Sequence, residues 1–312
     1  MTFSDPGAGY FRDEMRRLLV FGLLATSFAV TGATSSARPP TALLTYSAGP
    51  SRGLCLARPD GSRRVRLLAG EALGPSWSPD GRFVAFARRG KIVVANARGR
   101  IVRRFGSLGA DPAWSPDGSR IAYTAGAPAS RIIVASRTGR TLTSISTGRN
   151  VASSPTWSPN SRRLAYAEQL QIDRLSQPGS NRILVVNADR SHPRLLVGSA
   201  AEPAWSPDGS QIAYIAYASP LSDAGQVSVI GVAGTGARRV TSGDAPETGP
   251  AWSPNGRVIA FARRTGSSSV VVAIRPDGTS ERTLIPARSG GASDPAWRRP
   301  IALPRARRAS CS

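Results

Sequence analysis

The sequence predicts an all-β fold: a six-bladed β-propeller of four-stranded blades in which the C-terminal strand joins the N-terminal blade. Three observations predict it: a tryptophan motif that recurs six times, strand-like periodicity behind each full copy, and complementary incomplete repeats at the two ends. Of 312 residues, 40% are hydrophobic, which suffices for a packed core in a chain of this length.

The recurring motif is P-x-W-S-P-D-G or a close variant. It contains every tryptophan of the chain, namely Trp77, Trp114, Trp157, Trp205, Trp252 and Trp297. The copies recur about every 45 residues, which is the period of a propeller blade and is too long for leucine-rich or tetratricopeptide repeats. The tryptophans are therefore expected to be core wedges between blades.

Each full motif is followed by the remaining strands of a blade. An alternating segment such as 83–86 predicts the second strand, and a β-branched run such as 91–95 predicts the third. Between the first two strands, the proline presets φ, the acidic or amide side chain caps the turn, and glycine supplies positive φ. The residues at the capping position are interpreted as structural, and they are Asp80, Asp117, Asn160, Asp208 and Asn255.

The two ends of the chain complete each other. Three strand-like segments, 42–46, 53–57 and 64–68, precede the first tryptophan and lack a tryptophan strand of their own. After the last full repeat, the segment 295–297 supplies a tryptophan strand with no partners behind it. Pairing the two ends makes a sixth blade and removes the open edges of a linear array.

The repeat PxWSPDGxxIAF/Y, followed by an IVV-like strand, resembles the TolB-like, WD40-like (PD40) six-bladed propeller repeat over residues 42–297. The resemblance implies an envelope protein like the C-terminal part of TolB, which binds a peptidoglycan-associated lipoprotein and the Tol machinery. Neither the α/β domain that precedes the propeller in TolB nor the hydrolase domain of prolyl oligopeptidase relatives is predicted from the sequence. The Gly-His and Trp-Asp signatures of WD-repeat proteins are absent as well.

Residues 1–37 have the layout of a secretory signal peptide, with a possible N-terminal extension over 1–14 that depends on the true start. The apolar run 18–33 follows Arg16 and Arg17, and small residues favour cleavage after Ala37, with Ala33 as the second choice. A membrane anchor is the alternative, although the run is shorter than the roughly 20 residues that a bilayer needs. The predicted organisation is therefore signal 1–37, propeller 38–297 and an Arg-rich tail 298–312.

Composition and motifs argue against catalysis. One histidine and two cysteines are too few for a closed zinc site, which needs about four such ligands. The segment Gly49-Pro-Ser-Arg-Gly53 matches the nucleophile motif G-x-S-x-G, but it lies in a predicted hairpin, and His192 lies in a turn. We therefore predict no catalytic residues, no cofactor and no metal.

The predicted binding surface is the propeller face that carries the long connections, 168–181, 216–226 and the links between blades. On that face, three positions before each tryptophan, the blades carry Gly74, Asp111, Ser154, Glu202, Gly249 and Asp294. If the tryptophan strands line the channel, the three acidic residues form a collar suited to a cation or a basic peptide. The alternative interpretation is ordinary loop chemistry before a proline.

The chain carries 41 basic and 19 acidic residues, for a formal charge of +22, and nearly all the basic residues are arginines. Export removes nucleic acid as a partner, which leaves coding bias or attraction to an anionic cell-wall polymer as explanations. The tail adds Arg298, Arg299, Arg305, Arg307 and Arg308. Cys55 and Cys311 either form a disulfide that staples the ring shut or remain a buried thiol and a free tail thiol.

Together these features predict an exported, noncatalytic propeller, located in the periplasm, in the cell envelope or outside the cell. It is expected to act as a monomeric scaffold for an envelope protein or peptide. The alternative is a sensor or carrier domain that binds a small ligand or a cell-wall glycan at the channel mouth.

Overall fold

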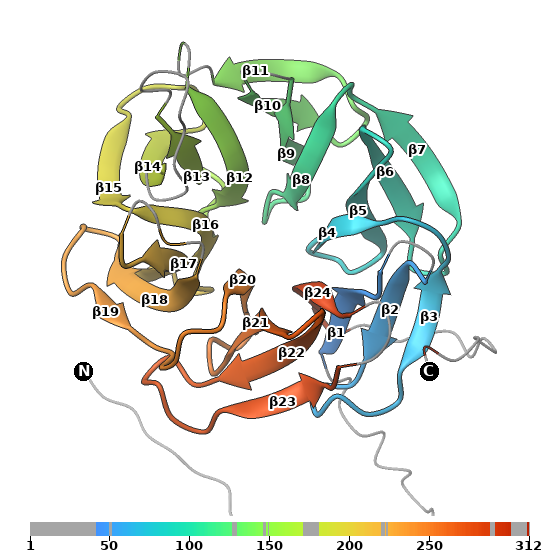
Figure 1. Cartoon of the computed structure of the whole chain (residues 1–312). Coiled ribbons are helices and arrows are strands. Elements are labelled where there is room, and N and C mark those ends of the chain that lie inside the picture. Colours follow the sequence, from blue (N-terminus) through green and yellow to red (C-terminus); the bar gives the residue numbers. More distant parts are fainter. Residues whose placement is uncertain are drawn as a thin grey trace, which may run out of the picture. The chain divides into compact units, whose positions relative to one another are not determined.

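The structure, a computed structural model, is a ring of six four-stranded antiparallel sheets arranged around a central axis (Figure 1). It describes residues 42–49, 52–126, 130–145, 148, 150–170, 181–219, 222, 224–287, 291–300 and 311. No helix occurs among these residues. The predicted six-bladed, four-stranded propeller is therefore confirmed.

The strands of each blade run in order from the channel outward. Blade 1 consists of β24 (Ser293–Arg298), β1 (Leu43–Ser47), β2 (Leu54–Ala57) and β3 (Val65–Leu68). Blade 2 consists of β4 (Leu73–Trp77), β5 (Phe83–Arg88), β6 (Lys91–Asn96) and β7 (Ile101–Phe105). Blade 3 consists of β8 (Gly109–Trp114), β9 (Arg120–Ala125), β10 (Arg131–Ser136) and β11 (Thr141–Ile145). Blade 4 consists of β12 (Val151–Trp157), β13 (Arg163–Gln169), β14 (Asn181–Asn187) and β15 (Arg194–Gly198). Blade 5 consists of β16 (Ala200–Trp205), β17 (Gln211–Tyr217), β18 (Gly225–Gly231) and β19 (Arg238–Arg239). Blade 6 consists of β20 (Glu247–Trp252), β21 (Ile259–Thr265), β22 (Ser268–Ile274) and β23 (Arg282–Ile285).

The core lies between neighbouring blades. The two middle strands of a blade are buried on both faces, as in β5 and β6, because each blade is covered by one neighbour on either side. One core cluster joins Leu56 of blade 1 to Trp77 and Phe86 of blade 2, and another joins Ile215 of blade 5 to Phe261 of blade 6. The continuous apolar runs in the sequence follow from this two-sided burial.

The ring closes through blade 1. The last strand, β24, pairs antiparallel with the first strand, β1, with Leu44 opposite Trp297 and Thr45 opposite Ala296. The predicted closure by the C-terminal strand is therefore confirmed. One boundary of the prediction is wrong: Arg298, which we assigned to the Arg-rich tail, is the last residue of β24 and is fully buried.

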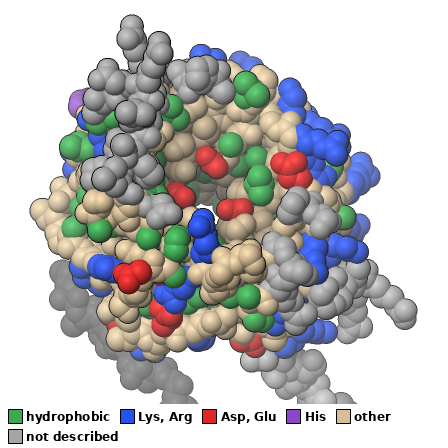
Figure 2. Space-filling model, viewed as in Figure 1, with side chains coloured by type: hydrophobic (Ala, Val, Ile, Leu, Met, Phe, Trp, Pro, Cys, Tyr) green, Lys and Arg blue, Asp and Glu red, His purple; other side chains and the backbone are tan. Residues whose placement is uncertain are grey.

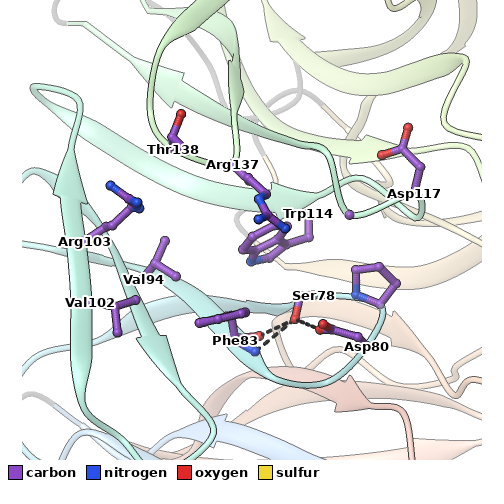
Figure 3. Close-up of a pocket in the computed structure, with 12 residues that line it drawn as sticks. Ser78, Asp80, Phe83, Val94, Val102, Arg103, Trp114, Asp117, Arg137 and Thr138 are labelled. Carbon is purple, nitrogen blue, oxygen red and sulfur yellow. Dashed lines mark hydrogen bonds between the residues drawn. The ribbon is translucent and has the colours of Figure 1, made fainter.

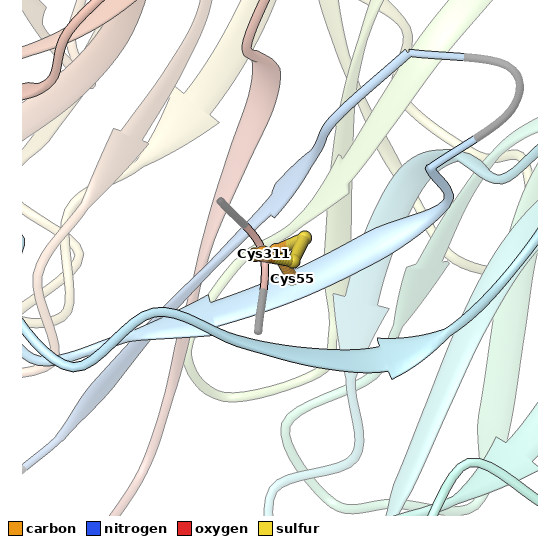
Figure 4. Close-up of a disulfide and its surroundings, with 2 residues drawn as sticks. All are labelled: Cys55 and Cys311. Carbon is orange, nitrogen blue, oxygen red and sulfur yellow. A yellow bond between two sulfur atoms is a disulfide. The ribbon is translucent and has the colours of Figure 1, made fainter. Parts of the chain in front are cut away.

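A disulfide joins Cys55 of β2 to Cys311 across a sequence separation of 256 residues (Figure 4). The two Cα atoms lie 6.2 Å apart, within the usual range for a disulfide. Both cysteines are buried and belong to the core cluster of blades 1 and 6. Of the two alternatives that the sequence leaves open, the structure has the cross-link.

The repeated S-P-D-G segments form the turns that the sequence predicts. In blade 2 the Ser78 hydroxyl donates to Asp80 Oδ1 at 2.6 Å, and the same oxygen accepts from the Arg82 backbone N–H at 3.0 Å. Gly81 has φ of 63°. In blade 4 a serine, Ser161, takes the place of the glycine and still has φ of 58°. The acidic side chains at these turns are occupied in holding the backbone.

The propeller lies within a compact unit that comprises residues 40–312. The predicted signal 1–37 and most of the tail, including Arg305, Arg307 and Arg308, fall outside the described residues. Among those that are described, none belongs to a helix long and apolar enough to cross a membrane.

Candidate functional site

One mouth of the central channel is built from the same repeat position of all six blades. This position lies three residues before the tryptophan, and the six residues line a single pocket of about 230 Å³ together with the prolines that follow them. Viewed from this face, acidic side chains gather around the central opening (Figure 2). The structure thus brings the predicted collar of Asp111, Glu202 and Asp294 to one place.

The collar position has an unusual backbone. All six residues have φ between 47° and 62°, and in the five blades from β4 to β20 the pairing with the neighbouring strand shifts register across them. Glycine adopts this left-handed conformation without strain, as in Gly74 and Gly249. Aspartate tolerates it, but a longer side chain such as that of Glu202 is disfavoured by about 1–2 kcal/mol. Of the three collar acids, Glu202 is therefore the one whose presence is least explained by the needs of a turn.

Two of the acidic side chains reach across to the next blade. Asp111 Oδ2 accepts from the backbone N–H of Ser154 at 3.3 Å and from the Thr124 hydroxyl at 3.1 Å. Glu202 Oε2 accepts from the backbone N–H of Gly249 at 2.5 Å. The acceptor and the donating N–H occupy equivalent repeat positions in adjacent blades, so one bond connects the channel-side strands of blades 3 and 4 and the other connects those of blades 5 and 6.

The collar carboxyl groups share one electrostatic environment. Burial raises the pKa of Glu202 to about 7; the Gly249 N–H opposes this rise, and the charges of Asp294 and Asp111 add to it. Burial also raises the pKa of Asp111, and hydrogen bonds from Thr124 and Ser154 oppose that shift while Asp294 adds to it. The charge of Asp294 therefore disfavours ionisation of both Glu202 and Asp111, and the charge of Asp111 disfavours ionisation of Glu202. A bound cation would relieve this repulsion.

The size of the mouth limits what it can take. A volume of about 230 Å³ is below the roughly 300–1,000 Å³ typical of pockets for small organic ligands. A single ammonium or guanidinium group on a side chain is small enough to enter. Among the described residues, no three His, Cys, Asp or Glu side chains lie close enough together to hold a metal ion.

The opposite end of the channel is lined by the tryptophans and by the serines and prolines that follow them. Trp77, Trp114, Trp157 and Trp205 are buried as predicted, whereas Trp252 and Trp297 are only partly buried. Three indole N–H groups donate to a carbonyl of the preceding blade, as Trp157 does to Ala113 at 3.1 Å. The tryptophans therefore connect blades as well as filling space.

The two glycines of the G-x-S-x-G match lie in a hairpin between two strands. Gly49 and Gly53 are joined by a backbone hydrogen bond of 3.1 Å in the hairpin between β1 and β2, and the structure does not describe Ser51. His192 is exposed in the turn between β14 and β15 of blade 4 and contacts Asn187. The hairpin and the histidine thus belong to different blades.

Sequence reasoning found the acidic members of the collar but missed their partners. The N–H groups of Ser154 and Gly249 act through the backbone, so no side-chain pattern identifies them. The signal that could have found them is the repeat itself, since a residue at one blade position faces the same position of the next blade.

Residues 46–301 match the family described as the TolB beta propeller domain. A curated relative, the Tol-Pal system protein TolB of Nitratidesulfovibrio vulgaris, is 41% identical over 61 residues. That match covers 19% of this chain and 14% of the relative, so the chain matches only a small part of that protein's length.

Solved structures share the fold. TolB from Acinetobacter baumannii superposes with a TM-score of 0.64 at 22% identity, covering 83% of this chain and 66% of that one. A putative TolB from Agrobacterium tumefaciens gives a TM-score of 0.61 at 17% identity, covering 85% of this chain and all of that one. A chain of a nidogen/laminin complex gives a TM-score of 0.64 at 15% identity, covering 82% and 98%.

Proposed function

The chain belongs to the TolB beta propeller domain family, and from this membership we propose that it is an exported, noncatalytic scaffold that binds an envelope protein or peptide. The observation that carries the proposal is the convergence of Asp111, Glu202 and Asp294 at one channel mouth. The partner presents a basic side chain to this collar. The curated relative is named as a protein of the Tol-Pal system, which supports an envelope location and a protein partner.

The chemistry of the mouth favours a peptide side chain over a free small ligand. The collar offers carboxylate acceptors but only a small volume, so most of the binding surface must lie outside it, on the surrounding loops. A protein interface of at least about 1,000 Å² fits this arrangement. A sensor or carrier domain for a small ligand or glycan remains the second candidate, and binding of such a ligand to the collar would favour it.

The test is capture of partners from the native envelope by the purified propeller at moderate salt, with a collar variant beside it. The collar variant is Asp111→Asn, Glu202→Gln, Asp294→Asn. The matched control is Asp80→Asn, Asp117→Asn, Asp208→Asn, which removes three carboxylates from the turns. Asn160 and Asn255 already occupy that turn position in other blades, so the control variant should fold.

We expect a defined protein that is retained by the parent chain and by the turn variant but lost by the collar variant. A lysine- or arginine-containing peptide from that protein should then bind in a direct titration. Retention by the collar variant would refute the collar as the site. Capture of nothing but salt-labile polymer would refute the scaffold and favour attraction to anionic cell-wall material.

A further inference from the structure

A second pocket lies between blades 2 and 3, away from the collar. Its volume is about 360 Å³, which is within the range of small-molecule sites. It opens beside the S-P-D-G turns that follow β4 and β8, whereas the collar lies before the tryptophans of the same strands. The two sites are therefore at opposite ends of the channel-side strands, and this pocket is independent of the proposed scaffold function.

At one repeat position the blade that borders the pocket differs from the two blades that follow it. Six residues after the tryptophan, blades 3 and 4 carry arginines that lie over the tryptophan of the next blade, Arg120 over Trp157 at 4.5 Å and Arg163 over Trp205 at 5.8 Å. Blade 2 has Phe83 at this position. In the described part of the chain, no arginine lies over the ring of the next tryptophan, Trp114, so the space that a guanidinium fills elsewhere is open.

The walls of the pocket are apolar and partly aromatic. Phe83 of β5, Val94 of β6 and Val102 of β7 form one side, and Trp114 at the end of β8 forms another (Figure 3). Val102 is 40% exposed although it is a large apolar side chain, so a ligand that covers it gains hydrophobic stabilisation. A planar ring between Phe83 and Trp114 would also gain aromatic contacts.

The indole N–H of Trp114 is closed off from the pocket. Its Nε1 is buried and has no hydrogen-bond acceptor among the described residues. Trp205 shares this property, but its ring is covered by Arg163. An unpaired buried donor is costly, but this atom has no exposed surface, so the pocket offers a ligand the ring of Trp114 and not its N–H.

The charges of the pocket favour an anion. Each carboxylate already has a neighbouring arginine of its own turn: Asp117 lies 3.4 Å from Arg120, and Asp80 lies 4.0 Å from Arg82. Partial burial alone would raise the pKa of Asp117, but hydrogen bonds from Ser115 and Ser119 together with Arg120 lower it to about 2. This carboxylate is therefore charged and satisfied at neutral pH.

The other two arginines have no such partner. Arg103 of β7 and Arg137 of the turn after β10 line the pocket, and neither forms an ion pair with any described acidic residue. In the view of Figure 3, Arg103 and the carboxylate of Asp117 lie at opposite ends, with Trp114 and Arg137 between them. Each of these two arginines is therefore available to bind a carboxylate.

We propose that this pocket binds a small aromatic carboxylate. The ring lies between Phe83 and Trp114 against Val94 and Val102, and the carboxylate is held by Arg103 and Arg137. No bond is made or broken, so the site is a binding site only.

The test is isothermal titration of the purified chain with naphthalene-2-carboxylate, and with neutral naphthalene-2-methanol for comparison. The decisive variant is Phe83→Arg, which installs the residue that blades 3 and 4 carry at the same position and should fold normally. Arg103→Gln and Arg137→Gln test the charge requirement. Arg257→Gln removes an exposed arginine from blade 6 and is the matched control.

We expect one saturable site for naphthalene-2-carboxylate and about tenfold weaker binding of the neutral compound. Phe83→Arg should reduce affinity at least about tenfold with an unchanged thermal midpoint, and each pocket arginine variant should weaken binding while Arg257→Gln does not. Binding that survives Phe83→Arg, that tolerates both pocket arginine variants, or that fails to saturate in the parent chain would overturn the proposal.

Discussion

The guanidinium carbon of Arg298 lies 4.6 Å from the centre of the Trp77 ring. Its Nε also donates to the carbonyl of Gly81 at 2.9 Å, a contact that spans 217 residues of sequence. Arg298, the C-terminal residue of β24, thereby connects blade 1 to the tryptophan and the S-P-D-G turn of blade 2. Arg120 and Arg163 make the same kind of contact with tryptophan elsewhere, but from a different position of the repeat.

Arg298→Ala should lower the free energy of unfolding by about 3 kcal/mol, because it leaves a cavity and removes both the cation–π contact and the hydrogen bond to Gly81. Arg298→Lys should lie between the parent and the alanine variant, since an ammonium group cannot stack as a planar guanidinium does. Chemical denaturation measures both. Arg299→Ala, at an exposed neighbouring position, is the control, and equal effects at 298 and 299 would contradict this role.

Glu202→Gln should change how stability depends on pH. The folded chain ionises this carboxyl near pH 7, whereas its ordinary pKa is 4.5, so folding binds a proton between these values. The parent should therefore lose about 3 kcal/mol of stability from this group as pH rises from 4.5 to 7, and the variant should not. Unfolding curves at several pH values give the difference. Parallel pH profiles for the two proteins would show that Glu202 titrates normally.

Asp294→Gly and Asp294→Ala should differ in stability by about 1 kcal/mol, with glycine the more stable, because the residue has φ of 48°. Both substitutions remove the same carboxylate, so the difference reports the backbone alone. The control is Ala296→Gly in the extended part of β24, where glycine should be destabilising instead. Thermal melts are sufficient, and a more stable alanine variant at 294 would be inconsistent with the left-handed backbone.

Glu247→Gln should destabilise the chain by about 3 kcal/mol, because this buried carboxylate binds both blades 5 and 6. It accepts from the Val227 N–H at 2.9 Å and the Thr241 hydroxyl at 2.6 Å, and Arg263 Nη2 lies 2.8 Å away. Glu281→Gln removes the exposed partner of the same arginine and should cost less than about 1 kcal/mol. Urea denaturation compares the two, and similar losses would contradict the special role of Glu247.

Cys311→Ser should lower the free energy of unfolding by about 4 kcal/mol under oxidising conditions, because the cross-link closes a loop of 256 residues. This variant is preferred to one at Cys55, whose substitution would also disturb a fully buried strand. Under reducing conditions the parent and the variant should converge. A difference that persists with reductant present would assign the effect to packing of the tail instead.

The architecture can be predicted from the sequence because it follows from the repeat. Trp77 and its five equivalents, the S-P-D-G turns and the unmatched ends together determine blade number, strand number and closure. The collar follows for the same reason, since equivalent positions of a closed ring must meet. Glu202 could be placed at the mouth from its spacing, but its raised pKa could not be, because burial depends on how tightly neighbouring blades approach.

Features that depend on a single departure from the repeat were not predicted. Phe83 reads as an ordinary strand residue, and only the structure shows that it lines a pocket together with Trp114. Arg298 reads as the first residue of a basic tail, because nothing local indicates that Trp77, far along the chain, covers it. In both cases the contacting residue lies on another blade, and the periodicity within one repeat gives no information about such contacts between blades.

Closure through β24 also has a consequence for biosynthesis. The strand that covers the inner edge of β1 is made after β1 to β23, so blade 1 remains incomplete until the ribosome has passed Arg298. A product truncated before that point would expose an unpaired strand edge, the kind of feature that promotes aggregation and proteolysis. The ring can therefore close only after the whole propeller has been translated.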